Sequence, residues 1–169
     1  FISISDESLK IIEKAFVMLS EGLTIMPPIM RLDIEKFNGE VDVKTAYIKG
    51  WDNFAIKISP GFFNNPKIGL PSTSGMMLLF NSKNGILEAV LLDQGYLTNV
   101  RTAVAGAIAS KYLANLEVDN VGIIGSGMQA QLQLQALMLV RRPTTAYVWG
   151  RDKFKTAAYI DLMKKKLKI

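Results

Sequence analysis

The chain has 169 residues, 49% of them hydrophobic and 21% charged, with a formal net charge of +5, which predicts one ordinary globular domain or two small ones. It contains no Cys and no His, so a disulfide scaffold, a thiolate zinc site, a cysteine nucleophile and a Ser-His-Asp hydrolase are excluded, and we predict no metal site. Basic residues do not interleave with aromatic ones, so we expect no nucleic-acid partner. No apolar run reaches the roughly 20 residues of a membrane span, and no secretory signal opens the sequence. We therefore expect a cytoplasmic protein without a membrane partner.

The first half predicts one helix followed by a sheet. Ser5 is a good helix N-cap, apolar residues then recur at helical spacing, and Gly22 ends the run. Five segments have the alternating or apolar pattern of strands: 29–34, 41–47, 54–58, 76–80 and 86–93. Residues 60–71 read as a long loop and 81–85 as a hairpin turn. We expect a mostly antiparallel sheet.

The second half alternates helices and strands. Thr98 is a possible cap for a helix from residue 99 to about 116, and a second helix from residue 128 to about 142 stops before Pro143. Apolar strands are expected at 118–124 and 145–149, and Asp152 caps a last helix that runs to the end. This change of pattern predicts a domain boundary near residue 117.

A glycine motif lies between the first of these strands and its helix. Residues 121–130 (VGIIGSGMQA) match G-x-G-x-x-G/A. The first glycine permits a tight turn, the second lets a diphosphate approach bare backbone, Ala130 allows close packing, and the helix start offers free N–H groups. The predicted cofactor contacts here are Gly125, Ser126, Gly127, Met128 and Gln129. The alternative is a tight turn that binds nothing.

The end of the second strand bears on the choice of cofactor. An acidic residue there would bind the ribose 2′-OH of NAD. This sequence has Gly150 at that place, followed by Arg151, which could pair with a 2′-phosphate or stack on adenine. We expect NAD or NADP, with NADP favoured. The alternative makes Arg151 a surface residue beside a helix cap.

Three segments together are similar to one known family. Residues 69–72 (GLPS), 97–103 (LTNVRTA) and 121–130 occur in the order and spacing of the ornithine cyclodeaminase/mu-crystallin family, and the resemblance runs from about residue 27 to 152. It implies an α/β homodimer, with residues 1–116 as an antiparallel-sheet substrate-binding and dimerisation domain and 117–169 as the first part of a Rossmann NAD(P)-binding domain. Because the family is roughly twice as long, we expect the chain to be truncated.

The resemblance also implies site residues. Two arginines and a lysine hold the substrate carboxylate in the family, and the matching positions are Arg31, Lys57 and Arg101; forked guanidinium groups and an ammonium suit a carboxylate. A solvated strand lysine and an ordinary ion pair are the alternatives for Lys57 and Arg101. Ser72 matches a position near the nicotinamide, or else caps its own loop, and Thr102 is expected to reach the cofactor.

One departure from the family bears on the reaction. Ornithine cyclodeaminases carry a glutamate in the strand before the lysine, where this sequence has Lys44. A lysine can protonate an imine nitrogen or bind a second acidic group, or it is simply exposed. With Lys44 and Lys57 as catalytic residues, or a proton donor beyond residue 169, the sequence predicts NAD(P)-dependent hydride transfer at the α-carbon of a small amino or imino acid. A strict ornithine cyclodeaminase and a non-enzymatic, crystallin-like NADPH or ligand binder are the alternatives.

Overall fold

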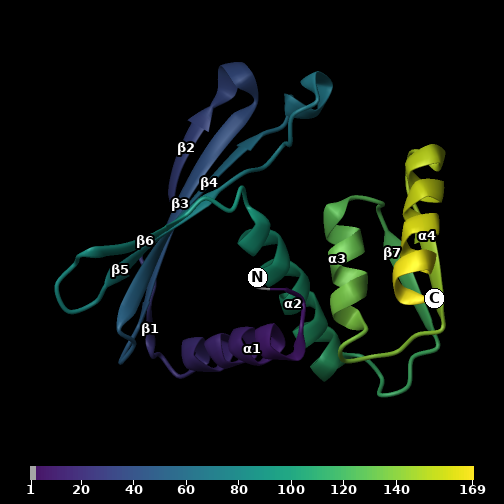
Figure 1. Ribbon diagram of the computed structural model, residues 1–169, viewed down its shortest axis with the longest axis horizontal. Helices are drawn as coiled ribbons and strands as arrows, with labels where there is room; N and C mark the ends of the chain where they lie inside the picture. The colour runs from purple at the N-terminus through teal and green to yellow at the C-terminus, as the bar shows by residue number, and fades with distance from the viewer. Residues whose placement is uncertain (1–2) are drawn as a thin grey trace. The chain divides into compact units, whose positions relative to one another are not determined.

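The computed structural model describes residues 3–169 (Figure 1). Its internal contacts divide the chain into two compact units. Ala15–Thr98 form what we call the sheet unit, and the described residues up to Lys14 join Asn99–Ile169 in what we call the helical unit. Two helices, α1 (Asp6–Ser20) and α2 (Tyr96–Leu113), run from one unit into the other.

The sheet unit is built on an antiparallel sheet. Its strands are β1 (Thr24–Ile25), β2 (Met30–Ile34), β3 (Gly39–Ile48), β4 (Asn53–Phe62), β5 (Met76–Asn81) and β6 (Leu87–Leu91). They are ordered β1-β3-β4-β5-β6, with β2 also paired to β3. The 3₁₀ turns Glu35–Phe37 and Asn65–Ile68 lie in the connections.

The two faces of this sheet differ in chemistry because side chains alternate along each strand. The register pairs Arg31 with Asp42, Asp42 with Ser59, and Lys44 with Lys57, so these polar residues share one face. The opposite face is apolar. Phe54 stacks on Phe80 there, with ring centroids 5.2 Å apart, while Met30 and Leu32 remain 64% and 59% exposed.

Two glycines set the start of α2 against the sheet. A Cβ on Gly75 would lie 3.1 Å from Ile58 O and 3.5 Å from Gly95 Cα, and Gly95 has a φ of +86°, so the backbones meet closely only because both residues lack side chains. Asp93 then caps the helix, accepting from Leu97 N at 2.7 Å. The predicted cap at Thr98 is therefore wrong: Thr98 lies inside the first turn.

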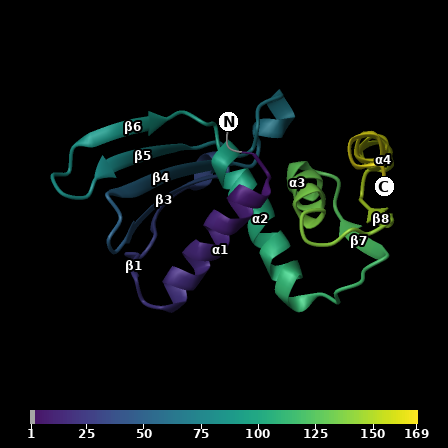
Figure 2. The ribbon, with the colours of Figure 1, turned by 60° about the horizontal axis from the view of Figure 1, so that its bottom comes forward.

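The helical unit contains a parallel pair of strands. β7 (Asn120–Ile124) pairs in parallel with β8 (Thr145–Trp149), and α3 (Met128–Leu137) and α4 (Lys153–Leu167) follow them (Figure 2). Leu134 of α3 packs with Tyr159 and Met163 of α4 on one face of the pair, and Tyr159 Oη donates to Ala130 O at 3.1 Å. The other face carries exposed Ile124, Tyr147 and Trp149.

Small residues bring α2 close to its neighbours. Ala103, Val104 and Ala107 are buried against Leu9 of α1, with Leu132 of α3 packed beside them. A Cβ on Gly106 would lie 3.0 Å from Gln133 Oε1 of α3. At the far end of α2, Arg141 donates to four backbone carbonyl groups, including those of Lys111 and Ala114, which satisfies the helix end.

The predicted fold class is confirmed, and the differences lie at element ends. The helix expected at 99–116 is Tyr96–Leu113, and the one expected at 128–142 stops at Leu137. The loop expected from residue 60 begins later, because β4 continues to Phe62. The two-domain boundary near residue 117 stays a prediction. Over residues 3–169, no helix has the length and apolarity needed to cross a membrane.

Candidate functional site

The glycine turn leaves an open cradle at the start of α3. Gly125 has a φ of +111°, which favours glycine, and its N–H donates to Trp149 O at 2.8 Å, tying the two strand ends together. Gly127 is the N-cap, and no side chain within residues 3–169 caps the helix from there. A Cβ on either glycine would meet no described atom within 4 Å. The first N–H groups of α3 are thus open to an anion.

Next to this cradle lies a cavity of about 350 Å³. Four of the predicted cofactor contacts line it: Gly125, Ser126, Gly150 and Arg151. Lys155, from the first turn of α4, lines it as well, and sequence reasoning missed this residue. The available signal was its position four residues after Arg151, one helical turn beyond the Asp152 cap, whose carboxylate accepts from Lys155 N at 3.0 Å.

The position expected to hold an acid in an NAD site is closed by local packing. A Cβ on Gly150 would overlap Thr156 Oγ1, which donates to Asp152 O at 2.8 Å. Any side chain at residue 150 would therefore have to displace a hydroxyl held by the α4 cap. The cavity is lined by the exposed cations Arg151 and Lys155 and by one acid, Asp152, whose carboxylate accepts from Lys155 N. The two cations outnumber the acid, so the lining favours an anionic group.

A second cluster occupies the polar face of the sheet. Lys44 and Lys57 face each other directly across β3 and β4. Lys44 Nζ lies 3.0 Å from Asp42 Oδ2, and Lys57 Nζ lies 3.5 Å from Thr98 Oγ1 at the start of α2. Thr98 is thus a second site residue that sequence reasoning missed, because the cap that it was thought to provide comes from Asp93.

Asp42 is the acidic centre of this cluster. The hydrogen bond from Lys44 holds the pKa of Asp42 below its ordinary value of 3.8, and the charges of Lys44, Arg31 and Lys57 lower it further against the opposing effect of burial. Asp42 Oδ1 and Ser59 Oγ are both buried without a hydrogen-bond partner among the described residues. The carboxylate is therefore ionised, and its Oδ1 accepts no hydrogen bond from the described residues.

Arg31 shares this face, yet its donors point at the protein itself. Its Nε donates to Asp33 at 2.9 Å, its Nη2 donates to Glu40, and its Nη1 lies 4.0 Å from Asp42 Oδ1. These carboxylates raise the pKa of Arg31, and the hydrogen bond that Arg31 donates to Asp33 is the largest cause. A substrate carboxylate would have to compete with them, so the binding role of Arg31 stays a prediction.

The remaining predicted residues fall on separate elements. Arg101 is exposed on α2, and in the described part of the chain its guanidinium has no acidic partner. Thr102 follows it, half-buried. Ser72 lies in the loop before β5, where its carbonyl accepts from Phe62 N at 2.7 Å. Gln129, the second residue of α3, donates to Asn99 Oδ1 at 3.0 Å.

Comparison with known proteins identifies relatives along the whole chain. The model of the ornithine cyclodeaminase/mu-crystallin family matches residues 2–169. The sequence is 55% identical over 157 residues to the protein named "Putative dehydrogenase RB0419" of Rhizobium meliloti (strain 1021), an alignment that covers 93% of this chain and 48% of that protein.

Two solved structures share the fold. The Thermococcus litoralis Delta(1)-pyrroline-2-carboxylate reductase, in complex with NADH and L-proline, matches with a TM-score of 0.92 and 32% identity, over 99% of this chain and 51% of that one. An archaeal alanine dehydrogenase dimer with bound NAD matches with a TM-score of 0.88 and 29% identity, over 98% and 50% respectively. The present chain spans about half the length of these relatives.

Proposed function

Because the chain belongs to the ornithine cyclodeaminase/mu-crystallin family, we propose that it is an NAD(P)-dependent oxidoreductase acting at the α-carbon of a small amino or imino acid. Relatives of this kind are NAD-dependent dehydrogenases and reductases. The observation that carries the proposal is the uncapped start of α3 beside a cavity with a cationic rim. When bound, the nicotinamide cofactor supplies the hydride chemistry.

The protein's part in binding the cofactor is electrostatic. The backbone N–H groups that follow Gly127 hold the diphosphate, because they are uncapped and lie at the positive end of α3. The closed position at Gly150 and the cations Arg151 and Lys155 favour a 2′-phosphate over a bare 2′-hydroxyl. We therefore propose a preference for NADP, with Lys155 added to the predicted contacts.

As the family resemblance implies, Lys57 and Arg101 are our proposed ligands of the substrate carboxylate. Lys57 Nζ lies 3.5 Å from Thr98 Oγ1 within the sheet unit, and Arg101 belongs to the helical unit. A carboxylate bound by an ammonium and a guanidinium is charge-neutralised and fixed in orientation. In reduction of an imine, the hydride adds to the α-carbon and the nitrogen takes a proton. Lys44, whose ammonium faces the same side of the sheet, is our proposed donor.

The apolar face of the sheet fits a second copy of the chain. Exposed Met30, Leu32 and Val90 lie on this face, and extended exposed apolar surface marks an interface. One structural relative is itself a dimer. We propose a homodimer joined through this face. Light scattering should give twice the chain mass, and Leu32→Lys should halve it.

A substrate screen tests the proposed activity. NADH and NADPH are followed at 340 nm with keto acids plus ammonia or methylamine and with cyclic imino acids, and NAD and NADP are followed with amino acids. Net change of cofactor absorbance supports the proposal. Proline from ornithine with catalytic NAD, and no net NADH, would instead favour the cyclodeaminase. Cofactor binding without any turnover would favour the crystallin-like binder.

A further inference from the structure

The side chain of Gln129 links the start of α3, just after the glycine turn, to α2, the helix that carries Arg101. Gln129 is the second residue of α3, immediately after the glycine turn, and its Nε2 donates to two acceptors on one residue of α2. These are Asn99 O at 3.2 Å and Asn99 Oδ1 at 3.0 Å. Asn99 lies two residues before Arg101 on α2. All these residues belong to the helical unit.

The amide of Gln129 is fixed at both of its ends. While Nε2 donates to Asn99, Oε1 accepts from Gln133 Nε2 at 3.4 Å, one turn further along α3. This second bond orients the amide with its N–H groups towards α2. Both bonds from Gln129 to Asn99 are partly shielded from water, so they are stronger than equivalent bonds on the surface.

Packing alone does not account for this bridge. Apolar and small side chains already hold α3 against α2, through Leu132 and the close approach at Gly106. These contacts resist separation of the helices, but they include no directional bond between the first turns of α2 and α3. A bidentate hydrogen bond is directional, and it fixes the first turn of α3 relative to the first turn of α2.

We propose that Gln129 is a positioning residue that couples cofactor binding to substrate-carboxylate binding. This inference rests on the proposed function, because it takes the N–H groups of α3 as the diphosphate site and Arg101 as a carboxylate ligand. The bridge sets the separation of those two sites. A misplacement of about 1 Å between reacting groups lowers rates by roughly 100-fold, so the bridge matters for turnover more than for either ligand alone.

Binding measurements test the coupling without turnover. NADH affinity is titrated by its fluorescence, alone and with saturating L-proline or L-alanine, which form non-reacting complexes with the reduced cofactor. In the wild-type chain we expect the amino acid to tighten NADH by about 5- to 10-fold. In Gln129→Met that factor should fall to about 1. The Kd for NADH alone should change less than about 2-fold, because the contact expected from Gln129 to the diphosphate is made by its backbone N–H, which the substitution keeps.

Two controls define the result. Gln135→Met removes an amide that, among the described residues, donates only to Gln131 O of its own helix, and Asn99→Asp keeps both acceptors for Gln129. Both should retain the wild-type factor. The inference is overturned if neither amino acid tightens NADH in the wild type, if Gln129→Met retains the factor, or if it only lowers Tm and NADH affinity. Coupling without turnover of any substrate would leave this inference standing and overturn the proposed function instead.

Discussion

Lys44 and Lys57 lie directly opposite each other on β3 and β4, with both ammonium groups on the same face of the sheet. Like charges in directly opposed positions destabilise a sheet. Asp42 offsets part of this repulsion through its contact with Lys44 at 3.0 Å, but a neutral pair would remove it altogether. An anionic ligand bound between the two ammonium groups would relieve the remaining repulsion, which favours a binding role for this pair.

Replacing Lys57 should therefore separate function from stability. We expect Lys57→Met to lower kcat/KM by roughly 30- to several-thousand-fold, the range that follows from about 2–5 kcal/mol for losing one partner of a charge pair in a binding site. Its Tm should equal or exceed that of the wild type. Lys49→Met is the matched control, since Lys49 Nζ donates to Gly22 O, its one hydrogen-bond acceptor within residues 3–169. A solvated strand lysine at 57 would leave both quantities unchanged.

Arg101 should act on substrate affinity. Because its guanidinium is exposed and has no acidic partner among residues 3–169, Arg101→Gln removes no ion pair from that part of the chain. We expect KM for the amino or imino acid to rise about 10- to 100-fold, or roughly 1.4–3 kcal/mol, at unchanged Tm. Arg142→Gln, which changes another exposed arginine, should match the wild type. An unchanged KM in steady-state assays would argue against the carboxylate role.

Alanine substitution at Gly127 should weaken cofactor binding, whereas alanine substitution at Gly150 should lower Tm. Gly127 has a φ of −86° and open space around a Cβ, so Gly127→Ala should fold normally. Its methyl group would instead occupy the place of the diphosphate, and we expect cofactor Kd to rise at least about 10-fold. Gly150→Ala should lower Tm, because its Cβ overlaps Thr156 Oγ1. Calorimetry measures Tm, and fluorescence titration measures the cofactor Kd. Normal cofactor affinity in Gly127→Ala would contradict binding of the diphosphate at the start of α3.

Cofactor choice should depend on the cationic rim of the cavity. Arg151→Gln and Lys155→Gln should each weaken NADPH binding by about 10-fold, the loss expected for one charged hydrogen bond, and leave NADH binding unchanged. Lys153→Gln lies in the same turn of α4 and does not line the cavity, so it serves as the control. Equal losses for both cofactors would show that Arg151 contacts the adenine rather than a 2′-phosphate.

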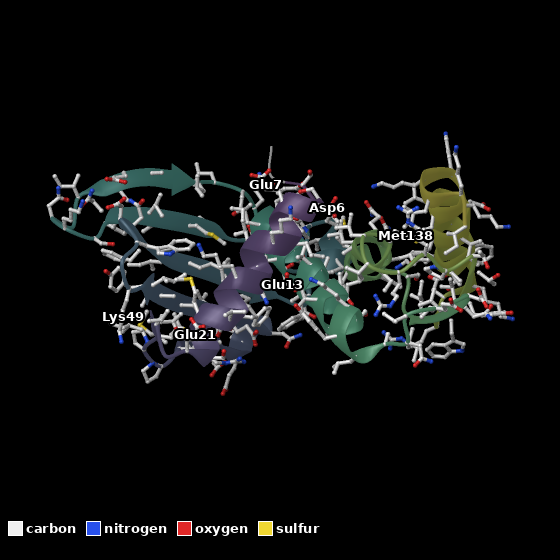
Figure 3. All side chains as sticks on the ribbon, turned by 90° about the horizontal axis from the view of Figure 1, so that it is seen from below. Asp6, Glu7, Glu13, Glu21, Lys49 and Met138 are labelled. Carbon is white, nitrogen blue, oxygen red and sulfur yellow. The ribbon has the colours of Figure 1, made fainter. Side chains whose placement is uncertain are left out.

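Stability at low pH should report on Glu13, which is labelled on α1 in Figure 3. Hydrogen bonds from Lys111, at 2.7 Å, and from Tyr112 hold the pKa of Glu13 below its ordinary value of 4.5. A carboxyl whose pKa is lower in the folded state than in the unfolded state stabilises the fold fully at pH values above the unfolded-state pKa. This contribution disappears as the pH falls through the folded-state pKa. Glu13→Gln should therefore have a lower Tm at neutral pH and a flatter Tm profile below about pH 4.5.

The control for this pH dependence is Glu21→Gln, a substitution of an exposed glutamate near the end of the same helix. Its Tm should still fall in acid as in the wild type, because the contacts of Glu13 with Lys111 and Tyr112 are intact. If Glu13→Gln loses stability in acid as steeply as the wild type does, the contact between α1 and α2 does not depend on this carboxylate.

The sequence alone determined the features that depend on local chemistry. Gly125 was recognisable because a tight turn off a strand needs a residue without Cβ, and Asp152 because a helix start needs an acceptor; the structure confirms both conformations. The alternation from residue 41 to 58 predicted two strands with Lys44 and Lys57 on them. The family resemblance, carried by segments with such fixed requirements, is confirmed by the family match.

Only the tertiary structure decided which residues meet. Thr98 is not the predicted cap, because Asp93 accepts from Leu97 N, and its contact with Lys57 joins residues 41 positions apart in sequence. The close approach of Gly75 and Gly95 likewise joins segments 20 residues apart. The closed position at Gly150 depends on a hydroxyl six residues later, and the bridge from Gln129 spans 30 residues to Asn99. Such contacts depend on how helices and strands pack in three dimensions, and a linear pattern of residues does not contain that information.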